Sequence, residues 1–249
     1  MATPVLYQIH YSPWSEKARW ALAACAVAYR KVEYLPMIET PLLRARLGRW
    51  TGKVTVPALF ADGRAYADSF AIAQWAASRG GVVQLFPADR KADSEAWNVR
   101  SETVLAHGRA LLTPRVGGDP AAALEQVPKG LRWIGPLSAP LVAFGVRYLR
   151  DKYALEAVGQ SERRAAIRTE LAALRTALAG GDHLLGTFTY ADIAMAVALQ
   201  VVQPVGDQHL RLGSATRAAW RDPELAEEFA DLLGWRDRLY DRFRRPVAQ

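Results

Sequence analysis

The chain has 249 residues, of which 51% are hydrophobic, and its formal net charge is +7. This length fits two domains better than one large core. The single cysteine, Cys25, excludes an intramolecular disulfide bond and a zinc site built from several thiolates. The four histidines show no metal-ligand spacing, so we expect no metal.

The distribution of apolar and charged residues bounds the partners of the chain. No signal peptide is recognisable, and the most apolar region, Leu131–Leu149, is interrupted by charged residues and prolines. We therefore expect a soluble, cytoplasmic protein that does not enter a membrane. Residues 1–80 carry +5 of the net charge, but these charges are scattered and form no nucleic-acid motif. A small anionic ligand is a simpler partner than nucleic acid.

The first element is a short buried strand over Val5–Ile9, and the sequence SPWS follows it. Ser12 fits the N-cap of a helix, Pro13 fits its first position, and Glu16 lies in the first turn, where the helix dipole favours a carboxylate. Apolar residues then recur at steps of three and four, with Cys25 among them, while Lys17 and Arg19 lie off this face. Cys25 is therefore expected to be a core thiol and not a nucleophile.

Residues 30–77 contain short elements separated by turn residues. We expect, in chain order, a strand at Arg30–Leu35, a helix at Thr40–Leu47, and hairpin strands at Ala58–Ala61 and Arg64–Ala67. Before the hairpin, Val56-Pro57 is a candidate for a cis peptide bond. After it, Asp68 or Ser69 caps the next helix. The resulting order is β-α-β-α-β-β-α.

This order, with a capped first helix and a proline before the third strand, resembles the thioredoxin fold. The pair Asp68-Ser69 in YADSFAIAQW makes it similar to the N-terminal domain of the cytosolic glutathione transferases, of the type with an active-site serine. The resemblance implies that Asp68 and Ser69 bind the γ-glutamyl end of glutathione and that Val56, before Pro57, pairs its backbone with the cysteinyl part. Taken alone, these are an ordinary helix cap and strand end; the ordered set carries the likeness.

The rest of the chain is expected to be helical, with amphipathic segments at Ala92–Leu112 and Glu162–Leu178 and one or two more helices within Glu224–Phe243. The predicted fold class is therefore α+β, with a thioredoxin-like glutathione-binding domain at residues 1–80, a linker at 81–90, and an all-α domain at 91–249. The resemblance places the site for an electrophilic substrate in the second domain.

The sequence GTFTYADIAMAVAL at 186–199 contains a second motif of the same family. Thr189 followed by Asp192 predicts a capping box, and Phe188 with Ile193 predicts a hydrophobic staple. In glutathione transferases the matching box supports folding, so we interpret both residues as structural.

The segment Thr113–Gln160 departs from the family, because it holds five prolines and is longer than the usual connection. Its aromatic residues predict either a helix with loops packed on the helical domain or a lid over the electrophile site.

The resemblance also suggests a mechanism. Ser12 matches the catalytic serine or cysteine of members whose first strand leads directly into the helix. A cysteine there supports thiol exchange, whereas a hydroxyl can only donate a hydrogen bond to the thiolate of glutathione. Tyr11 is the competing donor. Lys53 is a candidate partner for the glycine carboxylate, and Trp14 for the electrophile pocket.

The activity implied is transfer of glutathione, the co-substrate, to a small hydrophobic electrophile, as in detoxification, by a homodimer. The residues do not identify the electrophile or a dimer interface. Two alternatives remain: a protein that binds glutathione or a hydrophobic ligand without turnover, and a non-catalytic interaction module of the same fold.

Overall fold

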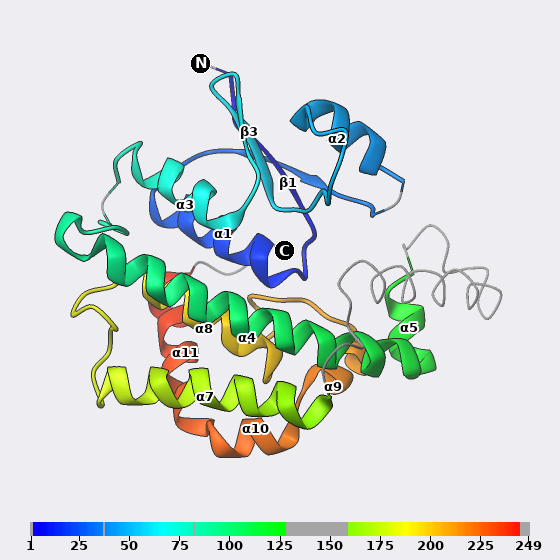
Figure 1. The fold of residues 1–249 in the computed structure, drawn as a ribbon, viewed down its shortest axis with the longest axis vertical. Helices are drawn as coiled ribbons and strands as arrows, with labels where there is room; N and C mark the ends of the chain where they lie inside the picture. The colour runs from blue at the N-terminus through cyan, green and yellow to red at the C-terminus, as the bar shows by residue number, and fades with distance from the viewer. Residues whose placement is uncertain (1, 37, 82, 128–158, 245–249) are drawn as a thin grey trace. The chain divides into compact units, whose positions relative to one another are not determined.

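The computed structural model describes residues 2–36, 38–81, 83–127 and 159–244, and its trace divides into two compact units that interleave along the sequence (Figure 1). The first unit comprises Met1–Asn98, Gly181–Val197 and Asp241–Arg245. The second unit comprises Val99–Gly180, Ala198–Tyr240 and Pro246–Gln249. The segment Thr113–Gln160, for which a packed helix with loops or a lid was predicted, falls largely on residues 128–158, which lie outside the described residues.

The first unit is built on a four-stranded mixed sheet with the strand order β2-β1-β3-β4. The strands are β1 (Val5–Gln8), β2 (Arg30–Glu33), β3 (Ala58–Ala61) and β4 (Arg64–Tyr66). β1 is parallel to β2 and antiparallel to β3, and β3 forms the expected hairpin with β4. Asp62 and Gly63 both have positive φ angles in the hairpin turn, as a tight turn requires.

Three helices cover this sheet, and their bounds follow from their capping residues. They are α1 (Pro13–Ala24), α2 (Thr40–Leu47) and α3 (Ser69–Ala77). α2 begins beside Pro41 and ends at Gly48, whose φ of 63° is the left-handed conformation that glycine adopts without strain. In Figure 1, α1 and α3 lie together on one side of the strands and α2 lies on the other. On the α2 side, Leu43 joins Tyr7, Ala58 and their neighbours in a buried cluster.

Residues from later in the chain complete the first unit. Helix α8 (Tyr190–Ala198) is buried along most of its length, and Tyr190 stacks on Phe86 with ring centroids 5.1 Å apart. Phe188, just before α8, stacks on Phe243 with ring centroids 4.0 Å apart, and its ring centroid lies 6.1 Å from that of Trp20 in α1. The hydrophobic core of the first unit therefore depends on residues far beyond position 100.

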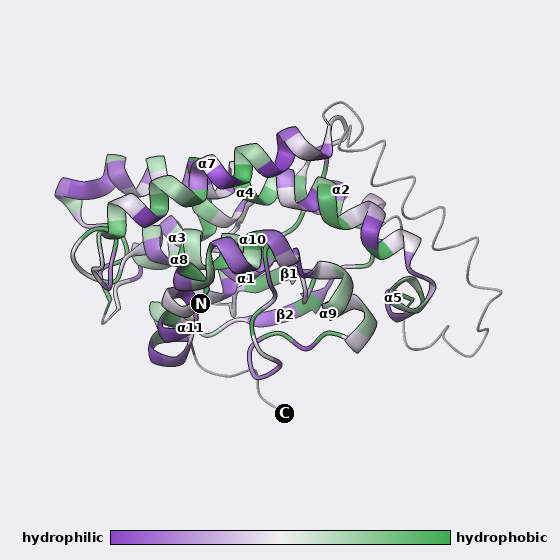
Figure 2. Cartoon of the chain, turned by 90° about the horizontal axis from the view of Figure 1, so that it is seen from below, coloured by the Kyte–Doolittle hydropathy of each residue, from purple (hydrophilic) through white to green (hydrophobic). Residues whose placement is uncertain are grey.

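The described secondary-structure elements of the second unit are all helices, joined by loops. Its elements are the later part of α4 (Lys91–Gly118), α5 (Pro120–Glu125), α7 (Gln160–Leu178), η3 (Leu199–Val201), α9 (Ser214–Trp220), α10 (Pro223–Glu228) and most of α11 (Ala230–Phe243). Figure 2 shows hydrophilic and hydrophobic residues alternating along α7, which buries Ile167, Leu171, Leu174 and Leu178. Among the residues that can be described, no helix is both long and apolar enough to span a bilayer.

One helix differs from the prediction. α4 was expected to end at Leu112, but it continues to Gly118 with Pro114 inside it. A proline in a helix leaves a carbonyl of the preceding turn without its usual donor. For Pro114 this is the Ala110 carbonyl; on either side of it, the Thr113 hydroxyl donates to the Arg109 carbonyl at 2.9 Å and the Arg115 side chain donates to the Leu111 carbonyl at 3.3 Å. These side-chain bonds accompany the continuation of the helix.

The predicted capping motif at α8 is present in a modified form. The buried Asp192 carboxylate accepts the Thr189 backbone N–H at 2.8 Å, which is half of a capping box. The Thr189 hydroxyl donates to the same carboxylate at 3.1 Å, and the Leu184 backbone N–H donates to it at 2.9 Å. Asp192 therefore holds both the helix start and the loop before it.

Candidate functional site

The sheet topology brings the predicted site segments to one edge. β1 and β3 are antiparallel, with Tyr7 opposite Ala58, so the C-terminal end of β1 and the start of β3 lie at the same end of the sheet. β4 runs back along β3, with Tyr66 opposite Leu59, so β4 also ends there. Ser12 follows β1, Val56 precedes β3, and Ser69 follows β4. The three segments that carry the resemblance therefore converge at one end of the sheet.

Ser12 is the N-cap of α1, as predicted. Its backbone is extended, with φ −70° and ψ 125°, and its Oγ accepts the Ser15 backbone N–H at 3.5 Å. Accepting this bond uses a lone pair of the hydroxyl and leaves its proton for another partner. No acceptor for that proton lies among the residues that the structure describes. Ser12 can therefore cap the helix and donate to an anion at the same time.

Tyr11 and its neighbour His10 lie between β1 and Ser12. The His10 ring contacts the Tyr11 ring edge to face at 4.9 Å, and the Glu33 carboxylate accepts the His10 backbone N–H at 2.7 Å. Burial, with a further contribution from the Glu33 carboxylate, raises the pKa of the Tyr11 phenol. The phenol therefore keeps its proton through the neutral range. Tyr11 can act as a hydrogen-bond donor, but the structure does not favour a tyrosinate.

The peptide bond between Val56 and Pro57 is cis, as predicted. The pairing of β1 with β3 ends at Ala58, so Val56 lies just beyond the paired residues. No hydrogen bond of the Val56 backbone is made within the described part of the chain. Its N–H and carbonyl can therefore pair with an extended peptide. Lys53 is exposed three residues earlier.

Asp68 and Ser69 form the start of α3. The Asp68 side chain caps the helix by accepting the Ala71 backbone N–H at 2.8 Å. This leaves the N–H groups of Ser69 and Phe70 without an intrahelical acceptor, as at every helix start. Ser69 is buried, and its hydroxyl has no hydrogen-bond partner within the described ranges. These donors, together with the positive end of the helix dipole, suit a carboxylate ligand.

A group of buried charges beneath this edge was missed by the sequence analysis. Arg19, placed off the apolar face of α1, is 7% exposed, and Glu16 is 4% exposed. The Arg19 Nε donates to Glu16 at 2.8 Å, and the Arg244 Nε donates to the other Glu16 oxygen at 2.7 Å. We call Glu16, Arg19 and Arg244 the buried ionic cluster. Burial alone would raise the pKa of the Glu16 carboxyl, but the two guanidinium groups hold it below its ordinary value.

Two other side chains of α1 differ in burial from a simple amphipathic pattern. Lys17, also placed off the apolar face, is fully buried, and its ammonium donates to Asn98 at 3.2 Å. Trp14, the candidate for the electrophile pocket, is half-buried near the helix start. The helix therefore has polar groups facing the interior on more than one side.

Cys25 is a buried free thiol at the C-terminal cap of α1, which confirms its assignment to the core. Burial raises its pKa, so little thiolate forms at neutral pH. We expect an aromatic disulfide reagent to modify the native protein at least about 100-fold more slowly than the protein unfolded in guanidinium. The release of the coloured thiol measures both rates on this single cysteine. Fast modification of the native protein would contradict a core position.

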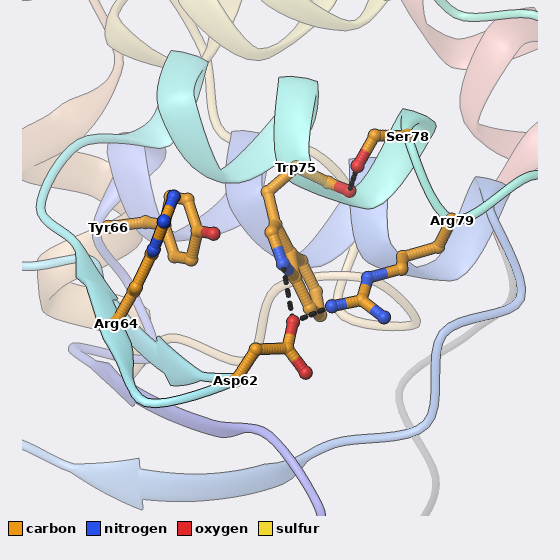
Figure 3. Close-up of a pocket in the computed structure, with 6 residues that line it drawn as sticks. All are labelled: Asp62, Arg64, Tyr66, Trp75, Ser78 and Arg79. Carbon is orange, nitrogen blue, oxygen red and sulfur yellow. Dashed lines mark hydrogen bonds and ion pairs between the residues drawn. The ribbon is translucent and has the colours of Figure 1, made fainter. Parts of the chain in front are cut away.

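A pocket at the opposite end of α3 contains none of the predicted site residues. Figure 3 shows Trp75 and Arg79 of this end pointing toward Asp62 of the hairpin, whereas the Ser78 hydroxyl is turned to the Trp75 carbonyl. Arg64 and Tyr66 also line this pocket. The Trp75 indole N–H donates to the Asp62 carboxylate at 3.2 Å, and Arg79 forms an ion pair with the same carboxylate. Because α3 has nine residues, its two ends lie about 13 Å apart. This pocket is therefore distinct from the site at Ser69.

A known protein family matches the N-terminal part of the chain. The pattern that defines the glutathione S-transferase N-terminal domain matches residues 11–79, a stretch that contains every predicted residue of the glutathione site. No curated protein has a matching sequence. In the part of the chain that the structure describes, no group of three or more His, Cys, Asp or Glu side chains could hold a metal ion.

Solved structures extend the likeness to nearly the whole chain. A β-etherase from Sphingobium sp. strain SYK-6 is 18% identical, with a TM-score of 0.62 over 97% of this chain and 96% of that one. A glutathione S-transferase from Methylobacterium radiotolerans, in complex with glutathione sulfonate, is 19% identical, with a TM-score of 0.58; the match covers 100% of this chain and 97% of that one.

A glutathione S-transferase from Ceriporiopsis subvermispora, in complex with glutathione, is 16% identical, with a TM-score of 0.63; the match covers 100% of this chain and 99% of that one. At these identities the structures show a shared fold, which confirms the predicted thioredoxin-like region followed by a helical one. Residues 11–79 therefore match the glutathione S-transferase N-terminal domain, and nearly the whole chain shares the fold of these solved structures.

Proposed function

We propose that this protein is a glutathione transferase in which Ser12 stabilises the thiolate of bound glutathione for attack on a small hydrophobic electrophile. The observation that carries the proposal is the convergence of three segments at one edge of the sheet. The segments that converge there carry the Ser12 hydroxyl with its available proton, the unpaired backbone of Val56, and the start of α3 at Ser69. These groups match the thiol, peptide and carboxylate parts of glutathione.

Each part of the ligand has a physical reason to bind at its segment. The γ-glutamyl carboxylate suits the free N–H groups and the Ser69 hydroxyl at the start of α3. The cysteinyl backbone suits the N–H and carbonyl of Val56. The exposed Lys53 is a candidate partner for the glycine carboxylate, and Trp14 is a candidate wall of the electrophile site.

The Ser12 hydroxyl supplies the activation in this proposal. It donates a hydrogen bond to the thiolate, and the start of α1 adds a partial positive charge. Lowering the pKa of the thiol by about two units requires about 2.7 kcal/mol of preference for the anion. A hydrogen bond to a charged group contributes about 1.5–3 kcal/mol, which is of the required size. The nucleophile belongs to the co-substrate, and the protein stabilises its reactive form.

Titration of the purified protein with reduced glutathione tests the proposal directly. Calorimetry measures binding, and the ultraviolet absorbance of thiolate, followed against pH, gives the pKa of the bound thiol. We expect binding with a thiol pKa below that of free glutathione. No binding at millimolar glutathione would overturn the proposal and favour a non-catalytic interaction module.

The reaction type requires a separate screen. A fold neighbour is described as a β-etherase, so the screen should contain an aryl ether beside an activated aryl chloride and an epoxide. Gel filtration and ultracentrifugation test the proposed homodimer in the same preparation.

The Ser69 hydroxyl should affect binding more than chemistry. In Ser69→Ala we expect the Kd and KM for glutathione to rise about tenfold with kcat nearly unchanged, because the lost bond is made equally in the ground state and the transition state. Steady-state kinetics and calorimetry measure these values. Ser78→Ala is the matched control, because it removes a hydroxyl from the opposite end of α3. Equal effects of the two substitutions would contradict a carboxylate site at Ser69.

A further inference from the structure

We infer that Arg244 is a positioning residue for Ser12, acting through Glu16 and Arg19 of the buried ionic cluster. Arg244 lies just after α11, whereas Ser12 lies at the start of α1. The inference rests on the proposed function only for its effect on glutathione. Its effect on the loop of residues 9–12 stands on the geometry alone.

The first step links Arg244 to Arg19. Glu16 lies one turn after Ser12, and its backbone N–H donates to the Ser12 carbonyl at 2.9 Å. Its carboxylate accepts from Arg244 at 2.7 Å and from Arg19 at 2.8 Å. Because the three side chains are buried or nearly so, the loss of the Arg244 guanidinium would leave one buried Glu16 oxygen without its donor, and Glu16 would be held from one side only. Arg244 therefore helps to fix Arg19.

The second step links Arg19 to the loop that carries Ser12. One terminal nitrogen of Arg19 donates to the His10 carbonyl at 2.8 Å, and the other donates to the Gln8 side chain at 2.8 Å. Gln8 donates in turn to Glu33 at 3.3 Å, and Glu33 accepts the His10 backbone N–H at 2.7 Å. Both sides of the residue at position 10 are thus held, two residues before Ser12.

Two further bonds complete the restraint. The Ser12 backbone N–H donates to the Ile9 carbonyl at 3.0 Å, and the Ile9 N–H donates to the Ser15 hydroxyl at 3.2 Å. These bonds define the turn itself but do not tie it to β1. Side-chain bonds tie the loop to β1 along two routes, one through Arg19 and one from Gln8 through Glu33 to the His10 N–H. The position of Ser12 therefore depends on the cluster through the first of these routes.

The cluster also has an electrostatic consequence for an anion at Ser12. Two guanidinium groups and one carboxylate leave one positive charge in excess. The cluster influences the titration of Lys31 in β2 and of Tyr29 just before β2. Glu33, the last residue of β2, faces His10 and influences Tyr11 on the loop. Burial and the two arginines lower the pKa of Lys31, which is a sign of the positive field. The excess positive charge of the cluster would favour a thiolate at Ser12, whereas the Glu33 carboxylate, which raises the pKa of Tyr11 after burial does, acts in the opposite direction.

The test measures the loop without any ligand. Hydrogen–deuterium exchange of the peptide that covers residues 9–15 is compared in the wild type, Arg244→Gln and Arg242→Gln. Arg242 is the matched control because it lies two residues earlier and is exposed, with no ion pair within the described residues. We expect Arg244→Gln to increase exchange of this peptide about fivefold or more and the control to leave it unchanged. Equal exchange in all three proteins would overturn the inference.

The second readout is the pKa of bound glutathione. We expect it to rise by about one unit in Arg244→Gln, and Arg244→Lys to recover at least half of the shift because it restores the charge. An unchanged thiol pKa in a folded Arg244→Gln protein would overturn the electrostatic part. If the wild type binds no glutathione, the proposed function fails, while the exchange experiment still decides the positioning role.

A second variant covers the case in which Arg244→Gln does not fold. Arg19→Lys keeps the charge and the Glu16–Arg244 pair, but a single ammonium cannot reach both Gln8 and the His10 carbonyl as the guanidinium does. We expect the same loosening of residues 9–15, with turnover lowered more than glutathione affinity. Normal exchange and normal kcat in this variant would overturn the inference.

Discussion

Replacing Ser12 by alanine should lower kcat/KM about 100-fold at neutral pH. The lost hydrogen bond to the thiolate is worth about 1.5–3 kcal/mol, and the bound thiol pKa should rise by about two units with it. Below the new pKa the rate should therefore increase with pH, because more of the thiol ionises. The Kd for glutathione should change little, because binding depends on the segments at Val56 and Ser69. The pH–rate profile and calorimetry measure both effects.

Two variants separate this effect from the loss of a helix cap. Ser12→Thr keeps a hydroxyl and can cap the helix, so we expect it to retain most of the activity. Tyr11→Phe removes the competing donor and should leave the thiol pKa nearly unchanged. If Ser12→Ala stays active and Tyr11→Phe is inactive, the thiolate donor is Tyr11 and the assignment to Ser12 is wrong.

Replacing Asp192 by alanine should destabilise the protein by about 3–5 kcal/mol. The substitution leaves three buried donors without an acceptor: the N–H groups of Leu184 and Thr189 and the Thr189 hydroxyl. Each unsatisfied buried donor costs about 1–3 kcal/mol, and the effects share one relaxing site. Equilibrium unfolding in urea measures the change, which should appear as a lower midpoint.

The controls for Asp192 use charge and position. Asp192→Asn keeps one carbonyl oxygen as an acceptor, so its loss of stability should be smaller than that of the alanine variant. Asp89→Ala removes an exposed carboxylate elsewhere in the chain and should change stability by no more than about 0.5 kcal/mol. Equal midpoints for Asp192→Ala and Asp89→Ala would contradict the structural role of Asp192.

Local sequence signals predicted the elements of the first unit well. The bounds of α2 were predicted because a proline near its start and Gly48 at its end are both local signals. Strand ends were less accurate. β1 ends at Gln8 and not at Ile9, because the Ile9 N–H turns to the Ser15 hydroxyl. A side-chain acceptor six residues away leaves no mark in the alternation of polar and apolar residues.

The site was predictable only where its residues belong to a local motif. The capping roles of Ser12 and Asp68 and the cis bond before Pro57 follow from neighbouring residues. The buried ionic cluster does not, because Arg244 lies 228 residues from Glu16 and both look like ordinary surface charges in the sequence. Helical periodicity places Arg19 off the apolar face of α1. It cannot show that the side of the helix that carries Arg19 is covered by a segment from far along the chain.

The interleaving of the first unit has a consequence for how the protein is made. Glu16 leaves the ribosome 228 residues before Arg244, a delay on the order of 10–50 s at ordinary rates of translation. Phe188 and Phe243 are also absent while α1 and the sheet first form. A nascent thioredoxin-like domain would thus expose Trp20 and an incompletely paired carboxylate to solvent. Expression of residues 1–80 alone, or a chimera joined at the predicted linker of residues 81–90, would make that transient exposure permanent.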